Sequence, residues 1–248
     1  MQSLRVKGGA EIRGSVTVSG NKNAALPMIA ALLLAEEECV LRNVPDILDV
    51  RTMLDIAGEL GAEFSFKNHV LKFRCRDIRT TKVSREMCSR NRTSILFAAP
   101  LIARCGAAEL FPPGGDVIGR RRLDGHFYGL IKLGSAMSGD ETYRFHAPGG
   151  LFGRELFLDE ASVTATEQIL IAAVTAKGKT TLYNAAGEPH VQDLAQLLNA
   201  MGGRITGAGS NTIEIEGVEK LHGCDYTIAG DHIEAGSFLA LAAATGGE

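Results

Sequence analysis

Near the N-terminus a lysine lies between two asparagines, where a segment of alternating apolar and polar residues is followed by a segment of apolar residues. The segment Val16-Thr-Val-Ser-Gly-Asn-Lys-Asn-Ala-Ala-Leu-Pro27 places Lys22 and Asn23 where a strand ends and a helix begins. The N-terminus of a helix presents free backbone N–H groups and partial positive charge, so a lysine there makes an anion site. The same residues also fit a plain helix start, with Asn23 as the cap and Lys22 in solvent.

A second candidate is a loop that combines an acid with arginines. Its sequence is Phe111-Pro-Pro-Gly-Gly-Asp-Val-Ile-Gly-Arg-Arg-Arg-Leu-Asp124, in which Asp116 precedes three consecutive arginines. Arginine binds phosphate or carboxylate through paired hydrogen bonds, and Asp116 is placed to donate a proton. A solvated loop tip with a structural Pro-Gly-Gly turn has the same composition, so the loop alone does not decide between the two.

The elements that must position these residues follow one order three times. Each unit begins with a helix that is apolar on nearly every side, as in helices buried inside a domain. A short strand follows, then an amphipathic helix that ends in Leu-Gly or Met-Gly, then an alternating hairpin. The buried helices are predicted at 24–35, 94–103 and 166–176, the strands at 39–41, 108–111 and 180–183, and the closing glycines are Gly61, Gly134 and Gly202.

The two ends of the chain stand outside these units. A fourth apolar helix is expected at 233–245, and residues 3–6 and 14–19 resemble two strands joined by a Gly-rich turn. We therefore expect an α/β (α+β) fold in which residues 21–229 form one three-unit domain. Residues 1–20 and 230–248 are expected to be the shared edge, or truncated start, of a second domain.

Composition excludes several classes of protein. The 248 residues are 45% hydrophobic and carry a formal net charge of -3, which predicts a folded chain with no bulk attraction to nucleic acid or acidic membranes. The odd number of cysteines, without a C-x-x-C pair, fits neither a disulfide framework nor a zinc site and indicates reduced thiols in the cytoplasm. The longest apolar stretch, 24–35, is too short to span a bilayer. The cysteines are Cys39, Cys75, Cys88, Cys105 and Cys224.

Four segments resemble, in order, motifs of the UDP-N-acetylglucosamine 1-carboxyvinyltransferase family of enolpyruvyl transferases. They are Ser19-Gly-Asn-Lys-Asn-Ala-Ala-Leu-Pro27, Pro113-Gly-Gly-Asp-Val-Ile-Gly119, Asn184-Ala-Ala-Gly-Glu-Pro189 and Asp231-His-Ile-Glu-Ala-Gly236. The resemblance covers the whole chain but only somewhat more than the front half of that family's protein. It implies inside-out, barrel-like α/β domains, each built from three repeated βαβαββ-type units.

The resemblance also implies a reaction. Members of the family move an enolpyruvyl group from phosphoenolpyruvate to the 3-hydroxyl of UDP-N-acetylglucosamine, by addition to a tetrahedral ketal and elimination of phosphate. This is the first committed step of peptidoglycan precursor synthesis, and it needs no metal or organic cofactor. The expected partners are these two small molecules, without nucleic acid or membrane.

By the same resemblance, Lys22 and Arg121 would hold phosphoenolpyruvate while Arg92 contributes positive potential. Asp116 would be the general acid and Asn23 would bind the sugar. The nucleotide site would be formed by Arg121, Arg122, Leu123, Asp124, Ser162, Val163 and Thr164. Asp49 also matches a family position near the active site, although a turn-forming aspartate is an equal interpretation.

Some positions depart from the family pattern. Many members have cysteine where this chain has Asp116, so we expect the epoxide fosfomycin, which alkylates that thiol, not to inactivate it. The other departures, which bear on nucleotide contacts and on the junction between domains, are Arg122, Glu160, Gly187 and His232. The family's catalytic aspartate and a further phosphoenolpyruvate-binding arginine lie beyond Glu248. The chain alone is therefore expected to be slow or inactive.

Two other functions remain open from the sequence. One is 5-enolpyruvylshikimate-3-phosphate synthase activity, which shares the fold and donor, although the Pro-Gly-Gly-Asp and Asn-Lys-Asn segments argue against it. The other is a non-catalytic UDP-sugar-binding or assembly module.

Overall fold

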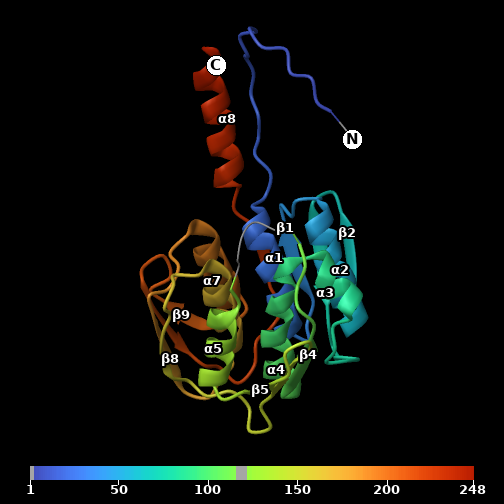
Figure 1. Cartoon of the computed structure of the whole chain (residues 1–248), viewed down its shortest axis with the longest axis vertical. Helices are drawn as coiled ribbons and strands as arrows, with labels where there is room; N and C mark the ends of the chain where they lie inside the picture. The colour runs from blue at the N-terminus through green and yellow to red at the C-terminus, as the bar shows by residue number, and fades with distance from the viewer. Residues whose placement is uncertain (1–2, 116–121) are drawn as a thin grey trace.

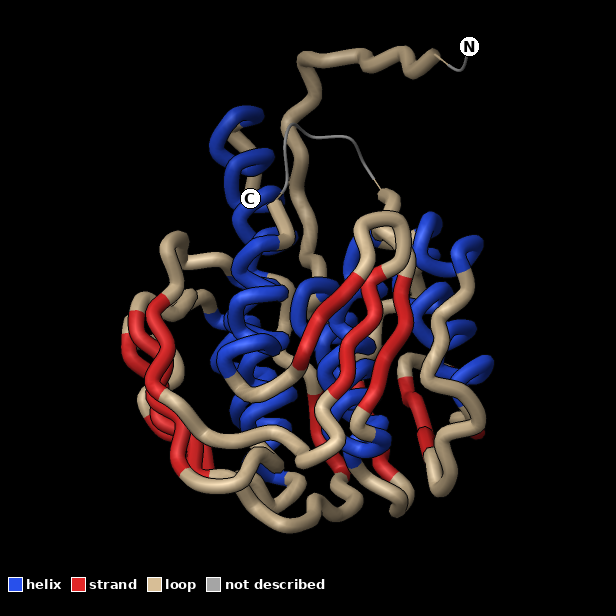
Figure 2. The backbone as a smooth tube through the Cα atoms, turned by 60° about the horizontal axis from the view of Figure 1, so that its bottom comes forward, coloured by secondary structure: helices blue, strands red, loops and turns tan. Residues whose placement is uncertain are grey.

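Three buried helical segments form the centre of the molecule in the computed structural model, which describes residues 3–115 and 122–248. Figure 2 shows the helices between sheets that lie at the outside. All residues from Ala24 to Ala35 are buried, which confirms the interpretation of that run as an interior helix. The inner segments are α1 (Lys22–Ala31) with the 3₁₀ turn η1 (Leu32–Leu34), η2 (Arg92–Phe97) continued by α4 (Ala98–Cys105), and α6 (Val163–Ala173).

The second helix of each unit buries one face. These helices are α2 (Leu48–Leu60), α5 (Asp124–Lys132) and α7 (Pro189–Ala200), and a short helix, α3 (Arg85–Arg90), precedes η2. Glycines follow all three, with φ of +119° at Gly61, +112° at Gly134 and +97° at Gly202. These left-handed conformations confirm the predicted helix ends, because only glycine adopts them without a steric cost.

Each unit contributes an antiparallel three-stranded sheet whose hairpin was predicted. The sheet orders are β11-β1-β3-β2, β4-β6-β5 and β7-β8-β10-β9. The short strands β7 and β11 were not predicted. The strands are β1 (Cys39–Arg42), β2 (Glu63–Lys67), β3 (Val70–Arg74), β4 (Ala107–Leu110), β5 (Ala136–Ser138), β6 (Tyr143–His146), β7 (Glu155–Phe157), β8 (Lys179–Tyr183), β9 (Arg204–Thr206), β10 (Thr212–Glu216) and β11 (Asp225–Thr227).

Parallel pairings join the units into a ring. The chain leaving unit one forms a parallel bridge from Lys82 to Glu109 in β4. After unit two, β7 pairs in parallel with β8, and after unit three, β11 pairs in parallel with β1. The last unit therefore closes onto the first. Across the described residues the strands remain in three separate sheets and form no single closed barrel.

The N-terminal segment and helix α8 (His232–Thr245) project together from one end of the ring (Figure 1). The fourth apolar helix is thus confirmed, but the two strands predicted at 3–6 and 14–19 are wrong, because residues 3–19 contain no strand. A strand needs a neighbouring strand for its backbone groups. This segment instead lies against a helix: Gly14 N donates to Glu248 O at 2.9 Å and Asp231 N to Ser19 O at 2.8 Å.

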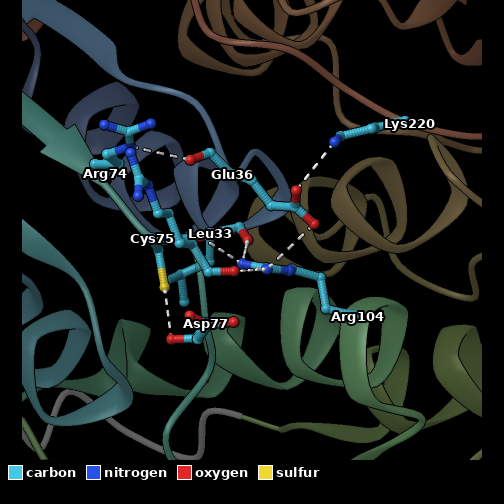
Figure 3. Close-up of polar contacts among 8 residues, drawn as sticks. Leu33, Glu36, Arg74, Cys75, Asp77, Arg104 and Lys220 are labelled. Carbon is cyan, nitrogen blue, oxygen red and sulfur yellow. Dashed lines mark hydrogen bonds and ion pairs between the residues drawn. The ribbon is translucent and has the colours of Figure 1, made fainter.

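Arg104, in the last turn of α4, ties unit two to unit one at the opposite end (Figure 3). Its guanidinium donates to the carbonyls of Leu33 at 3.0 Å, Cys75 at 2.8 Å and Arg76 at 2.6 Å. Glu36 lies 3.8 Å from the same guanidinium and also pairs with Lys220 of unit three at 3.0 Å. The Arg104 side chain therefore satisfies backbone carbonyls from two separate segments of unit one.

We expect Arg104→Ala to lower the free energy of unfolding by about 2–4 kcal/mol, because several charge-assisted hydrogen bonds to carbonyls are lost from a side chain only 16% exposed. Urea unfolding followed by circular dichroism measures this. The matched control is Arg204→Ala, which breaks an exposed pair with Glu216 and should cost less than about 1 kcal/mol. Equal losses in the two variants would contradict the role of Arg104.

Candidate functional site

Lys22 is the first residue of α1, and its ammonium pairs with the Asp49 carboxylate in the first turn of α2. The helix cap is Asn21, whose Oδ1 accepts from Ala24 N at 3.1 Å. The sequence interpretation of Asn23 as the cap is therefore wrong, because Asn21 occupies the position before the first helical residue. Asn23 is exposed beside Lys22. A cation and an exposed amide thus stand together at a helix N-terminus, which suits an anion.

Asn91 connects this end of unit one to the start of unit two. Its Nδ2 donates to the Asp49 carbonyl at 3.4 Å, while its Oδ1 accepts from Thr93 N at 2.9 Å and caps η2. Arg92, the first residue of η2, follows directly. The buried amide of Asn91 therefore links the start of η2, where Arg92 lies, to the first turn of α2, where Asp49 lies, and the role of Arg92 stays a prediction.

The Gly-rich loop after β4 begins against the end of α3 and the start of η2. Gly114 N donates to Cys88 O at 2.9 Å, and a Cβ at Gly114 would stand 1.8 Å from Ser89 O. Gly115 has φ of +95° and lies against Arg92. Both positions require glycine, for close approach in one case and for a left-handed backbone in the other. The loop residues Asp116 and Arg121, together with Arg120, lie outside the described residues, so their roles stay predictions.

Arg122 contacts Arg92 and borders a cavity. Arg92 Nη2 donates to the Arg122 carbonyl at 3.2 Å, and the Arg122 guanidinium pairs with Asp124. The cavity has a volume of about 270 Å³ and is lined by Arg122, Asp124, Gly125, His126, Tyr128, Leu158, Asp159, Glu160 and Ser162. The predicted nucleotide residues Arg122, Asp124 and Ser162 therefore come from separate segments to one cavity.

The start of α6 reaches this cavity through its N-cap Ser162, whereas the predicted residues Leu123, Val163 and Thr164 are not among the lining residues. Ser162 caps the helix by accepting from Ala165 N at 3.4 Å, Val163 packs against the core, and Thr164 Oγ1 lies 2.9 Å from His126 Nε2. Leu123 also packs against the core, just before α5. The predicted residues Ser162, Val163 and Thr164 are thus held by a cap and by a buried histidine that sequence reasoning did not single out.

His126 is 2% exposed and lies between Thr164 and Gln168. Gln168 Nε2 donates to Ile95 O at 3.4 Å, so its Oε1 faces His126 as an acceptor. The imidazole must then donate from Nδ1 and accept the Thr164 hydroxyl proton at Nε2. Burial lowers the pKa of His126 to about 4, with the positive charge of Arg92 acting in the same direction and the hydrogen bond to Gln168 opposing it. The imidazole is neutral at pH 7 and fixes the orientation of Thr164.

Acidic groups outnumber the cation around the cavity. Its lining contains Arg122 as the cation and Asp124, Asp159 and Glu160 as acids. The pKa of Arg122 is raised first by its hydrogen bond to Asp124, and Asp159 and Glu160 add to the effect. This charge balance suits the hydrogen-bonding groups of a base or sugar better than a diphosphate.

His232, a departure from the family pattern, lies where α8 leaves the ring. Its ring stacks on His190 of α7 with centroids 6.0 Å apart, and its Nδ1 lies 3.2 Å from Asn21 Nδ2. Since Asn21 caps α1, the start of α8 is connected to the Lys22 helix end through a single side chain.

The described part of the chain contains no cluster of three or more His, Cys, Asp or Glu side chains able to hold a metal ion. Within the same residues no helix has the length and apolarity needed to cross a membrane.

Comparison with known proteins assigns the chain to a family. Residues 6–248 match the family described as EPSP synthase (3-phosphoshikimate 1-carboxyvinyltransferase). The chain belongs to the EPSP synthase family. Within it, the chain is 50% identical over 248 residues to the UDP-N-acetylglucosamine 1-carboxyvinyltransferase of Borreliella burgdorferi and 51% identical over 248 residues to that of Treponema pallidum. It spans 58% of the length of each of these curated relatives.

Solved structures of EPSP synthase family proteins share the fold. The enolpyruvyl transferase NikO from Streptomyces tendae superposes with a TM-score of 0.81 at 22% identity, covering 94% of this chain and 55% of that protein. EPSP synthase from Acinetobacter baumannii gives a TM-score of 0.73 at 20% identity, covering 93% of this chain and 53% of that one. These likenesses confirm the predicted α/β enolpyruvyl transferase fold.

Proposed function

We propose that this chain forms one wall of the active site of an enolpyruvyl transferase that acts on UDP-N-acetylglucosamine. The reaction would transfer the enolpyruvyl group of phosphoenolpyruvate to the 3-hydroxyl of the sugar, with loss of phosphate. The observation that carries the proposal is the connected path from Lys22 through Asp49, Asn91 and Arg92 to the cavity beside Arg122. Relatives about half identical to the chain bear the matching name.

The proposed roles are those that the sequence resemblance implies. Lys22 and Arg121 hold the phosphoenolpyruvate anion, Arg92 adds positive potential, and Asn23 bonds the sugar. Asp116 donates the proton in the addition step. The cavity accepts the uridine end of the nucleotide against Arg122, Asp124 and Ser162, and Leu123, Val163 and Thr164, which adjoin them in the chain, complete the nucleotide site. We propose that no cofactor takes part.

The biological setting is part of the same proposal. An enzyme with this activity would supply the first committed step of peptidoglycan synthesis, and so affect cell wall biogenesis, cell shape, the cell cycle and cell division. The free cysteines support a cytoplasmic location.

We also propose that residues 1–20 and 230–248 contribute to a second domain, which supplies the opposite wall. None of the residues of α8 is buried, and large apolar side chains such as Leu239, 73% exposed, face solvent. Such a helix is typical of an element that packs against further structure.

The proposal is tested by calorimetric binding and by phosphate release. UDP-N-acetylglucosamine should bind the chain, and phosphoenolpyruvate should bind the resulting complex. Phosphate release with shikimate 3-phosphate as the acceptor, and not with UDP-N-acetylglucosamine, would assign the other activity in the family. If neither nucleotide sugar nor phosphoenolpyruvate binds, the proposal fails. Nucleotide-sugar binding that gives no phosphoenolpyruvate site would instead support a non-catalytic binder.

Glu160→Lys should tighten UDP-N-acetylglucosamine binding by roughly 10-fold, because it removes an acid of the cavity, which repels the anionic nucleotide, and puts a cation there that attracts it. Calorimetry at low and moderate salt measures this, and the gain should shrink as salt rises. Glu155→Lys, an exposed change in the nearby strand β7, is the control. A gain of equal size in the control would show only a bulk charge effect.

Fosfomycin should leave the protein unmodified, because a carboxylate at position 116 is a poorer target for the epoxide than a thiolate. Intact-mass spectrometry after incubation measures this. Asp116→Cys is the informative variant and should gain a covalent adduct. An adduct on Asp116 of the unmodified chain would refute the expectation.

A further inference from the structure

Two cysteines far apart in the sequence stand opposite each other where the ring of three units closes. Strand β1 pairs in parallel with β11, with Val40 opposite Asp225 and Leu41 opposite Tyr226. The same register places Cys39 beside Cys224, and Val40 N donates to the Cys224 carbonyl at 2.7 Å. Neighbouring strands run about 4.8 Å apart, within the range of Cα separations that a disulfide spans.

Contacts on both sides hold the two segments in this register. Before the cysteines, Glu36 pairs with Lys220 at 3.0 Å, and Gly223 N donates to Glu37 Oε2 at 3.1 Å. After them, the Arg42 guanidinium makes two hydrogen bonds to the Asp225 carboxylate, at 2.8 and 2.7 Å. The thiols therefore face each other in a fixed frame.

The two thiols differ in access. Cys39 is 0% exposed, whereas Cys224 is half-buried at the edge of the core. The pKa of Cys39 is lowered first by its hydrogen bond with the Cys224 side chain, while the pKa of Cys224 is raised by the same bond and by burial. Cys39 is therefore the more acidic of the two thiols and Cys224 the more accessible one.

We propose that Cys39 and Cys224 form a redox-active dithiol, which a small peroxide oxidises to a disulfide that locks unit three onto unit one. Cys39, the more acidic thiol, loses its proton first and then takes the proton of Cys224, the more accessible thiol. The resulting Cys224 thiolate attacks the peroxide, its sulfur becomes a sulfenic acid, and the peroxide, with the first proton, is reduced to an alcohol or water. The Cys39 thiol then attacks the Cys224 sulfur, and its proton leaves with the hydroxyl as water as the S–S bond forms. Two thiols and one peroxide thus give one disulfide, with the two electrons passing to the peroxide.

The geometry favours a disulfide over a metal site. Within the described residues no third His, Cys, Asp or Glu completes a metal-ligand cluster with these thiols. The remaining cysteines lie elsewhere: Cys75 and Cys88 are buried and Cys105 is exposed. Sequence spacing gave no sign of the pair, since it depends on the β1–β11 register. The inference does not depend on the proposed function.

The test treats the full chain with hydrogen peroxide and follows intact mass, peptide mapping and thermal unfolding. We expect loss of two hydrogens, a peptide joining Cys39 to Cys224, and a melting temperature higher by roughly 5–15 °C that dithiothreitol reverses, because the bridge closes a loop across all three units. Cys224→Ser should abolish all three changes, and Cys39→Ala should leave Cys224 as a sulfenic acid that traps dimedone. Cys105→Ser should behave as the unmodified chain.

The proposal is overturned if the oxidised chain lacks the joined peptide or if Cys224→Ser shows the same thermal shift. Overoxidation of Cys105 with Cys39 and Cys224 still reduced would overturn it as well.

Discussion

Replacing Lys22 with methionine should weaken phosphoenolpyruvate binding to the UDP-N-acetylglucosamine complex by about 100-fold, as expected for loss of a charge-assisted contact to a partly desolvated anion. In the unliganded chain Lys22 pairs with Asp49, and the two side chains are 45% and 34% exposed. Ion pairs at such exposure contribute little, so an anion carrying both carboxylate and phosphate can displace Asp49. Calorimetric titration of phosphoenolpyruvate measures the change.

The control for this variant is Arg51→Met, which removes an exposed cation of α2 that pairs with Asp46 at 2.8 Å. It should leave phosphoenolpyruvate binding unchanged, and both variants should unfold in urea within about 0.5 kcal/mol of the unmodified chain. If Lys22→Met binds phosphoenolpyruvate normally while UDP-N-acetylglucosamine still binds, Lys22 is not the anion site.

The order of the three units can be predicted from the sequence, because the apolar helix segments and the glycines at helix ends indicate the same elements. The apolar runs are too uniform for a surface helix, and Gly61, Gly134 and Gly202 mark the helix ends with a conformation that other residues avoid. The missed strands β7 and β11 have three residues each and take their stability from parallel neighbours in the next unit. No local pattern shows such a pairing.

The site is only partly visible in the sequence, for a related reason. Lys22 is found from its position at a helix start, and motif resemblance adds Arg92, Arg122 and Ser162. What connects them is long-range: Asn91 reaches the Asp49 carbonyl, and His126 reaches Thr164. A buried histidine in an amphipathic helix has no spacing signature, so its role emerges only when α5 packs on α6.

Protonation of the buried His126 makes the stability of the fold depend on pH. The folded-state pKa of His126 is about 4, against about 6.5 when unfolded. The unfolded chain therefore takes up a proton at a higher pH than the folded chain does. The stabilisation is fully present above pH 6.5 and is lost as pH falls toward 4. The total is about 3 kcal/mol, of which about 2 is lost by pH 5.

The measurement is the difference in unfolding free energy between pH 7.5 and pH 5.0, for the unmodified chain and for His126→Gln. Glutamine keeps a donor and an acceptor but does not titrate, so the variant should lose about 2 kcal/mol less over this interval. Burial raises the pKa of Glu167, so protonation of this carboxyl stabilises the folded chain as pH falls. Only the difference between the two proteins therefore isolates the contribution of His126. His146→Gln, at an exposed position in β6, is the control. If His126→Gln and the unmodified chain lose equal stability, the pKa of His126 is the same in the folded and the unfolded chain, and burial between Thr164 and Gln168 does not keep the imidazole neutral.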